Sequence, residues 1–279
     1  MRVSAMAGRI GRKFKELRKR NEAALIPFIV AGDPDLGTTR KLVLELEARG
    51  ADLIELGVPF SDPMADGPAN QRALARGLKA GASLAAILAT VQELRKETEI
   101  PIILFGYFNP IFHYGCERLC NDAARAGADA LLTVDLPFEE GEELARPARK
   151  AGLDIIQLLA PTTPIERARK VARSASGFLY YVSVTGVTGA RASLDAELSA
   201  HMRELRGVTK LPIGVGFGIS TPAQAAEVAA MADAVVVGSA LTLLVEKNAS
   251  TNGAVAAAGG LVGEMKQAMR AARTGAANG

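Results

Sequence analysis

The sequence predicts a single (β/α)8 TIM barrel with an extra helix at its N-terminus, and three observations support this fold. The length of 279 residues suits one barrel of about 250 residues with short terminal extensions. Short apolar runs alternate with helical patterns of roughly ten to fifteen residues, as in successive strand–helix units. The chain is 49% hydrophobic but has no Trp, so its core must be aliphatic, which suits strands that fill a barrel interior.

Eight apolar runs are the candidate strands. In order, they are Ala24–Val30, Ala51–Gly57, Pro101–Phe105, Ala128–Val134, Asp154–Leu159, Gly177–Ser183, Pro212–Gly216 and Ala232–Gly238. Helical patterns between them include Thr38–Arg49, Leu84–Thr98, Glu117–Ala126 and Ala223–Ala230. Eight strands favour a closed barrel over an open sheet. We therefore expect one domain over residues 1–279, with its core between about residues 10 and 270.

The N-terminal segment concentrates positive charge. Residues 9–20 carry seven bases and one acid, a net +6 in a chain whose total is +3. Ile10, Phe14 and Leu17 recur at helical spacing, so one face is apolar and the bases cover the other. We predict a helix packed on the barrel floor; a nucleic-acid patch and a targeting helix are the alternatives. At the other end, the Ala/Gly-rich tail Thr274–Gly279 is expected to be flexible.

A Gly-Ala-Asp or Ala-Asp sequence recurs before three candidate strands. It occurs at Gly50–Asp52, Gly127–Asp129 and Ala232–Asp233. Each copy ends one helix and starts the next strand, and glycine is the expected helix C-cap in the first two. We interpret this repeat as architectural.

Several functional classes are disfavoured by composition. The sequence has no run of eighteen apolar residues, so we expect no membrane span. Cys116 and Cys120 lie near His113, but these three and the distant His201 are a poor set of metal ligands. We expect ordinary thiols in a cytoplasmic protein that holds no metal and binds neither nucleic acid nor membrane.

Glycines follow the last two candidate strands. Gly216-Phe217-Gly218 and Gly238-Ser239 each end a strand and precede a helix. Backbone N–H groups at such places can converge on an anion. Tight turns are the plain alternative, but the loops after strands seven and eight are the usual phosphate site of this fold. The pattern therefore favours phosphate binding.

Two carboxylates accompany the second candidate strand. Glu55 lies near its C-terminal end, where a carboxyl group pointing into the barrel would have a raised pKa and could act as an acid–base catalyst. The alternative is an outward salt bridge, which side-chain alternation cannot exclude because both faces of a barrel strand are covered. Asp66 lies in the following proline-rich loop, where it could instead cap a turn.

The lysines argue against a Schiff-base aldolase, which needs a desolvated lysine in its site. Six lysines fall in helices or before strands, and none of these lies at the C-terminal end of a candidate strand. They are Lys41, Lys79, Lys96, Lys150, Lys170 and Lys210. The residues therefore favour carboxylate acid–base catalysis on a phosphorylated substrate.

Taken together, these segments resemble the tryptophan synthase alpha subunit family. The most specific match runs from Leu53 to Pro63 (LIELGVPFSDP) and continues as Ala65-Asp66-Gly67-Pro68. Further matching segments are Pro27-Phe28, Gly32-Asp33-Pro34, Tyr107, Asn109-Pro110, Asp135-Leu136-Pro137, Gly186–Gly189, Gly216–Ser220 and Gly238–Ala240. By spacing, the match covers about residues 10–270.

The resemblance implies reversible retro-aldol cleavage of indole-3-glycerol phosphate to indole and glyceraldehyde 3-phosphate, without a cofactor. It implies that Glu55 is the general acid–base, that Asp66 stabilises charge at the indole nitrogen and that Tyr180 lies beside Glu55. The implied indole contacts are Phe28, Leu104 and Leu132. The implied phosphate contacts are Gly189, Phe217, Gly218, Gly238 and Ser239.

A lid is expected from the glycines after the sixth candidate strand, and the resemblance implies a partner. The glycine-rich stretch Val184–Ala192 is expected to close over the substrate, bringing Thr188 to Asp66. The implied partner is a pyridoxal phosphate-dependent beta subunit in an alpha2beta2 heterotetramer, contacted by the loop around Pro59 and Asp62.

Three alternative functions are open. A stand-alone lyase of the same family would turn over rapidly without a partner. A non-catalytic, phosphate-binding module that activates a partner would not need both carboxylates. An isomerase of another phosphosugar would account for the glycines but not for the long second loop.

Overall fold

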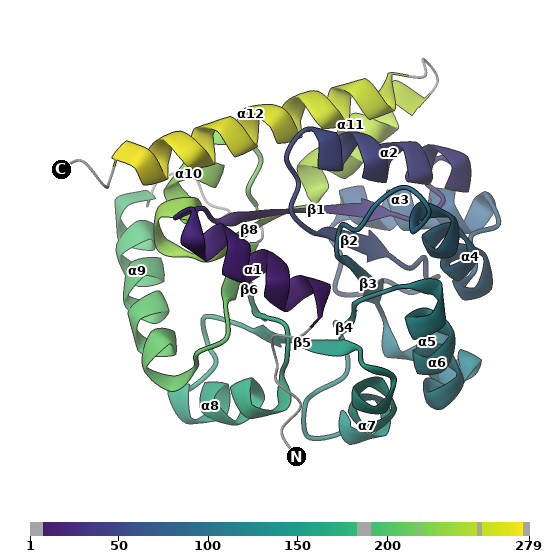
Figure 1. The fold of residues 1–279 in the computed structure, drawn as a ribbon, viewed down its shortest axis with the longest axis horizontal. Helices are drawn as coiled ribbons and strands as arrows, with labels where there is room; N and C mark the ends of the chain where they lie inside the picture. Colours follow the sequence, from purple (N-terminus) through teal and green to yellow (C-terminus); the bar gives the residue numbers. More distant parts are fainter. Residues whose placement is uncertain (1–7, 183–190, 217, 250–252, 276–279) are drawn as a thin grey trace.

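The computed structural model describes residues 8–182, 191–216, 218–249 and 253–275 (Figure 1). Eight parallel strands form a closed barrel in chain order, which confirms the predicted (β/α)8 fold. The strands are β1 (Ala24–Val30), β2 (Ile54–Gly57), β3 (Ile102–Gly106), β4 (Ala130–Thr133), β5 (Asp154–Leu159), β6 (Leu179–Val182), β7 (Ile213–Gly216) and β8 (Ala234–Val237).

The helices surround this barrel in the order of the chain (Figure 1). They are α1 (Arg9–Lys19), α2 (Leu36–Ala48), α3 (Pro68–Lys79), α4 (Leu84–Leu94), α5 (Phe108–Tyr114), α6 (Cys116–Ala126), α7 (Glu142–Ala151), α8 (Ile165–Ser174), α9 (Arg191–Val208), α10 (Pro222–Met231), α11 (Ser239–Asn248) and α12 (Ala254–Gly275). The last of these packs along α2, α10 and α11.

Side chains alternate between the barrel interior and the layer between strands and helices. The inner cluster takes Ala24, Ile26, Leu53, Ile103, Ala130, Leu132, Ile156, Phe178, Ala234 and Val236 from the strands and the residues beside them. The outer cluster takes Ile54 and Leu56, the two neighbours of Glu55. By alternation, Glu55 therefore faces the barrel interior.

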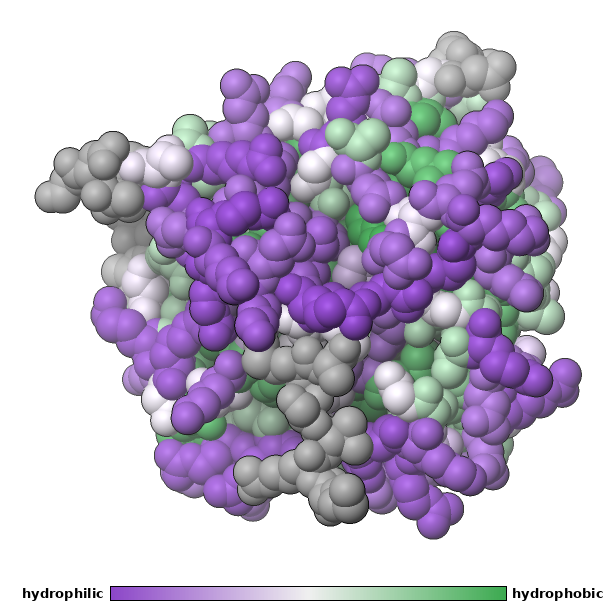
Figure 2. Space-filling model, in the orientation of Figure 1, coloured by the Kyte–Doolittle hydropathy of each residue, from purple (hydrophilic) through white to green (hydrophobic). Residues whose placement is uncertain are grey.

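Helix α1 closes the N-terminal end of the barrel, as the sequence predicts. Ile10, Phe14 and Leu17 are each less than 5% exposed and belong to the inner cluster. The rings of Phe14 and Phe178 lie 5.8 Å apart between centroids. Figure 1 shows α1 crossing the end of the barrel, and Figure 2 shows the hydrophilic surface that covers it.

The Asp residues of the Gly-Ala-Asp repeat build the floor of the barrel. Each Asp forms two hydrogen bonds with one residue of the neighbouring strand. Its carboxylate accepts the backbone N–H of that residue, and its own backbone N–H donates to the carbonyl of that residue. The pairs are Asp52 with Leu25, Asp129 with Ile102 and Asp233 with Ile213, and Ser176 forms the same pair with Ile155 through its hydroxyl.

The three carboxylates of the floor are also ion-paired. Lys266 lies 2.7 Å from Asp52, Arg95 lies 2.8 Å from Asp129, and Arg206 lies 2.5 Å from Asp233. These bonds lie just below strands β2, β4 and β8, which begin two or three residues later than the sequence patterns suggest. The architectural interpretation of the repeat is confirmed, although only Gly127 is a helix C-cap, since α2 is capped by Arg49 and Gly50 follows it.

Two smaller predictions can be compared with the structure. Cys116 and Cys120 are buried on α6 as free thiols, and burial raises the pKa of Cys120 to about 12. Among the described residues, no single helix is long and apolar enough to cross a membrane; α3 and α4 reach that length only as a pair bent by 92°.

Candidate active site

Glu55 lies on β2 and is fully buried. In the sheet it is opposite Phe28 of β1 and Ile103 of β3. Neither carboxylate oxygen has a hydrogen-bond partner among the described residues. Because burial without a partner disfavours the charged form, the pKa of Glu55 is raised well above its ordinary value. Burial therefore favours the protonated form of this carboxyl group.

Tyr180 lies on the inner face of β6 and packs against the inner cluster. Burial is the main cause that raises the pKa of Tyr180, and the nearby carboxyl groups of Glu55 and Asp66 raise it further. A side chain at Gly216 would overlap the Tyr180 hydroxyl, so this glycine of β7 gives the phenol its room. The structure thus places Tyr180 near both carboxylates.

Phe28 forms an aromatic wall beside Glu55. A Cβ atom at Gly57 would lie 2.8 Å from the tip of its ring, and one at Gly238 would lie 3.5 Å from its other side. The ring therefore reaches from the end of β2 to the start of α11. Phe105 packs on it edge-on, with 5.0 Å between ring centroids.

The structure corrects one predicted indole contact. Leu104 is buried in the outer cluster, between the barrel and the helices, so it does not face the interior. Its neighbour Phe105 packs against the inner cluster and against Phe28, and takes the place that the sequence interpretation gave to Leu104. Leu132 does belong to the inner cluster, as its predicted role requires.

Asp66 is held by two side chains from different elements. The Tyr107 hydroxyl, after β3, donates to Oδ2 over 2.6 Å, and the Asn70 amide, on α3, donates to Oδ1 over 3.2 Å. The same hydroxyl accepts the N–H of Ala65 over 3.0 Å. Since burial raises the pKa of Tyr107 well above its ordinary value, the phenol remains a donor. Each oxygen of the carboxylate thus accepts a side-chain hydrogen bond, and the sequence interpretation assigned neither partner.

The start of α11 offers free backbone donors. Gly238 precedes the helix, and no described side chain caps it. Helix α10, in contrast, begins with a capping box of Thr221 and Gln224. Uncapped N–H groups and the helix dipole together favour an anion. Ser239 follows Gly238 directly, and Gly218 lies in the preceding strand–helix loop, between β7 and α10. Both residues are exposed.

Three of the predicted contacts lie outside the described residues. They are Thr188, Gly189 and Phe217.

The predicted partner loop is divided between a buried and an exposed part. Pro59 is buried, with Cγ 2.8 Å from the position of a Cβ atom at Gly77 on α3. It therefore packs against α3 within this chain, and the predicted partner contact of the loop stays a prediction. Asp62 is exposed, and Met64 is 88% exposed.

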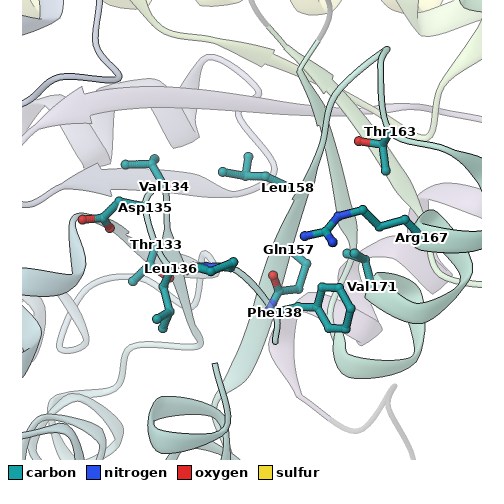
Figure 3. A pocket seen from close by; sticks show the side chains of 11 residues that line it. Thr133, Val134, Asp135, Leu136, Phe138, Gln157, Leu158, Thr163, Arg167 and Val171 are labelled. Carbon is teal, nitrogen blue, oxygen red and sulfur yellow. The ribbon is translucent and has the colours of Figure 1, made fainter. Parts of the chain in front are cut away.

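A cavity of about 250 Å³ opens at the carboxyl ends of β4 and β5 (Figure 3). Val134 and Leu158 line it and also pack against the inner cluster. On the outer side Arg167 stacks on Phe138, with 5.1 Å from the guanidinium to the ring centroid. The cavity thus lies at the side of the barrel mouth, and neither Glu55 nor Asp66 lines it.

Comparisons with known proteins identify the family of this chain. The family model described as tryptophan synthase alpha chain matches residues 14–270. The chain belongs to this family. A tryptophan synthase alpha chain from Geobacter sp. (strain M21) is 57% identical over 259 residues, which are 93% of this chain and 97% of that protein. The alpha chain of Gluconacetobacter diazotrophicus is 51% identical over 88% of this chain and 90% of its own length.

Solved structures of the family have the same fold. The tryptophan synthase alpha subunit of Legionella pneumophila str. Paris superposes with a TM-score of 0.88 at 40% identity, over 94% of this chain and 98% of that one. A chain of Mycobacterium tuberculosis tryptophan synthase superposes with a TM-score of 0.85 at 34% identity, over 95% and 99%. Membership confirms the resemblance found in the sequence. The chain is an enzyme subunit of tryptophan biosynthesis, and the reaction of this alpha chain family is the cleavage of indole-3-glycerol phosphate.

Proposed function

We propose that this chain cleaves indole-3-glycerol phosphate as a carbon–carbon lyase, with Glu55 as its general acid and base. The observation that carries the proposal is the buried, unpartnered carboxyl group of Glu55 inside the barrel. Breaking the bond between indole C3 and the glycerol carbon needs an electron sink, which indole becomes when C3 is protonated. A carboxyl group that holds its proton at neutral pH is suited to this step.

The proton balance closes on the same residue. Glu55 gives its proton to C3, and the carbon–carbon bond then breaks with its electron pair returning to the indole ring. The adjacent glycerol hydroxyl loses its proton as it becomes the aldehyde of glyceraldehyde 3-phosphate. Glu55, now a carboxylate, accepts that proton and is restored. The cycle consumes no cofactor.

Asp66 is proposed to stabilise the positive charge that develops at the indole nitrogen. The donors Tyr107 and Asn70 occupy one position on each of its oxygens, and a carboxylate oxygen can accept more than one hydrogen bond. A fixed carboxylate needs little rearrangement when the charge appears, which is the source of its catalytic effect.

The proposed substrate contacts follow the shape of the site. Phe28, Phe105 and Leu132 give the indole ring an apolar wall, with Tyr180 beside Glu55. The phosphate is proposed to bind at the start of α11. Its proposed contacts are Gly218, Gly238 and Ser239 from the described residues, and Gly189 and Phe217 from the sequence resemblance, which also suggests that Thr188 meets Asp66.

We also propose a partner, the tryptophan synthase beta subunit, in an alpha2beta2 complex. The exposed side chains of Asp62 and Met64 on the loop that carries Asp66 support a contact there, because an exposed methionine on a functional loop is typical of a docking surface. A cytoplasmic location is also proposed, because the substrate and products are small soluble metabolites.

The test is release of glyceraldehyde 3-phosphate from indole-3-glycerol phosphate, with and without a beta subunit, by wild type, Glu55→Gln and Asp66→Asn. The proposal expects slow cleavage by wild type alone, acceleration by the beta subunit, and loss of cleavage in both variants. Rapid cleavage without the partner would indicate a stand-alone lyase. Phosphate binding without cleavage under either condition would contradict the proposal and indicate a non-catalytic module.

A further inference from the structure

A polar chain links Asp66 to the first turn of α11. The Asn70 amide nitrogen donates to Asp66 Oδ1 over 3.2 Å. The Thr242 hydroxyl, 172 residues further along, donates to Asn70 Oδ1 over 3.0 Å. It also lies 3.0 Å from the carbonyl of Ser239, the first residue of α11. Asn70 and Thr242 therefore connect the carboxylate proposed for the indole end of the substrate to the helix proposed for the phosphate end.

The chemistry of the groups fixes the direction of these bonds. An ionised carboxylate can only accept, so the Asn70 amide must turn its nitrogen to Asp66 and its oxygen to Thr242. Thr242 is 2% exposed and has one hydroxyl proton for two acceptors, Asn70 Oδ1 and the Ser239 carbonyl. The hydroxyl of Thr242 therefore donates to one of these acceptors at a time. Because Thr242 and Ser239 both lie in the first turn of α11, the position of that turn affects how firmly Thr242 holds Asn70.

Ion pairs clamp the same two helices. Arg72 of α3 makes two hydrogen bonds of 2.8 Å to Glu246 of α11, and Arg76 of α3 donates to Glu246 over 2.8 Å. Arg76 also binds both oxygens of the buried Asp33, after β1, at 2.7 and 2.8 Å. Helices α3 and α11 are thus joined along their length, and the Asn70–Thr242 contact is the part of this seam that reaches Asp66.

We propose that Asn70 is a positioning residue that couples the phosphate site to Asp66 through Thr242. This inference rests on the proposed function. An anion at the start of α11 orders its first turn, including Thr242. Thr242 then holds the Asn70 amide, and the amide holds Asp66 in the orientation that meets the indole nitrogen. Occupancy of one end of the site thereby prepares the other end, and by linkage the effect is reciprocal.

The test uses variants that keep the shape of each side chain. Asn70→Leu removes the amide, Thr242→Val removes the hydroxyl, and the double variant completes a mutant cycle. Thr90→Val is the matched control, because Thr90 on α4 likewise donates to a carbonyl of its own helix, that of Ala86, away from the site. Each full-length protein is assayed with the beta subunit present.

The first readout is steady-state cleavage of indole-3-glycerol phosphate. Because an interaction that orients a charged group is needed mainly in the transition state, kcat falls with little change in KM. We expect a loss of about tenfold in Asn70→Leu, roughly threefold in Thr242→Val, and in the double variant no more than in Asn70→Leu. The control cleaves at the wild-type rate.

The second readout is binding of indole, measured by calorimetry with and without saturating inorganic phosphate. In wild type and in the control, phosphate strengthens indole binding by about fivefold, the lower range of ordinary coupling between two sites. In Asn70→Leu and Thr242→Val the two affinities agree within error. A purely structural role would lower stability or both affinities, but it would not remove the coupling alone.

The outcomes separate this inference from the proposed function. If wild type does not cleave the substrate, the proposed function fails and this inference fails with it. If wild type cleaves and Asn70→Leu has the same kcat and the same coupling, the inference alone is overturned. A loss of kcat in the double variant equal to the product of the two single losses would also overturn the inference. Such a result would mean that Asn70 and Thr242 act independently and not through one hydrogen-bonded chain.

Discussion

The floor and the mouth of this barrel treat buried polar groups in opposite ways. At the floor, Asp52, Asp129 and Asp233 each receive a backbone N–H and a cation. At the mouth, Glu55 is buried more deeply than these three but has neither partner within the described residues. A paired carboxylate contributes to holding strands in register, whereas an unpaired one lowers stability and keeps a proton for reaction. The difference separates residues that serve the fold from a residue that we propose serves the chemistry.

The largest effect is expected at the mouth, in Glu55→Gln. This substitution keeps the size of the side chain but removes the proton that is transferred. We expect kcat for cleavage to fall by about a thousandfold or more, equivalent to about 4 kcal/mol. Initial rates of glyceraldehyde 3-phosphate release measure it. Circular dichroism should show an unchanged fold, and a variant that retains even a tenth of wild-type activity would contradict the assigned role.

The next effect is expected at the floor, in Asp52→Asn. The change leaves the ammonium group of Lys266, which is 3% exposed, without its closest partner. We expect the free energy of unfolding to fall by about 3 kcal/mol, seen as a melting temperature lower by roughly 10 °C. Cleavage at low temperature should remain close to the wild-type rate.

Glu93→Gln is the matched control for the floor. Glu93 is ion-paired with Lys96 on the exposed side of α4, where screening makes the pair weak. Its melting temperature should equal that of wild type. Loss of activity rather than stability in Asp52→Asn would erase the distinction between floor and mouth.

The smallest effect is the pH dependence of stability. The pKa of Glu55 is raised in the folded protein by burial, so above the unfolded-state value the unfolded chain binds fewer protons than the folded one. Wild-type stability therefore decreases as pH rises from the unfolded-state pKa toward the folded-state pKa. Glu55→Gln lacks this loss. In thermal melts between roughly pH 5 and 8, the stability of the variant relative to wild type should increase with pH, and a constant difference would contradict it.

Patterns local in sequence predicted the fold well. Apolar runs located the eight strands, the spacing of Ile10, Phe14 and Leu17 located the floor helix, and the Gly-Ala-Asp repeat marked the strand entries. The family resemblance singled out Glu55 and Asp66. The structure then resolved what the pattern left open for Glu55, since the outward orientation of Ile54 and Leu56 requires it to face inward.

Features set by packing were not predictable in this way. Leu104 and Phe105 are both apolar, and because both faces of a barrel strand are covered, composition does not show which of them faces the interior. Pro59 lies in a loop, yet a glycine on the helix above lets that helix cover it. Asn70 and Thr242 meet across 172 residues, a contact that only the closure of the barrel creates.

The protonation state of Glu55 tests the central claim most directly. Infrared spectroscopy of the protein with ¹³C-labelled glutamate carboxyl groups, compared with Glu55→Gln, isolates the band of this one group. We predict a protonated carboxylic acid band for Glu55 at neutral pH that is missing in the variant. A carboxylate band for Glu55 under the same conditions would contradict the account, because the mouth would then hold an ionised group just as the floor does.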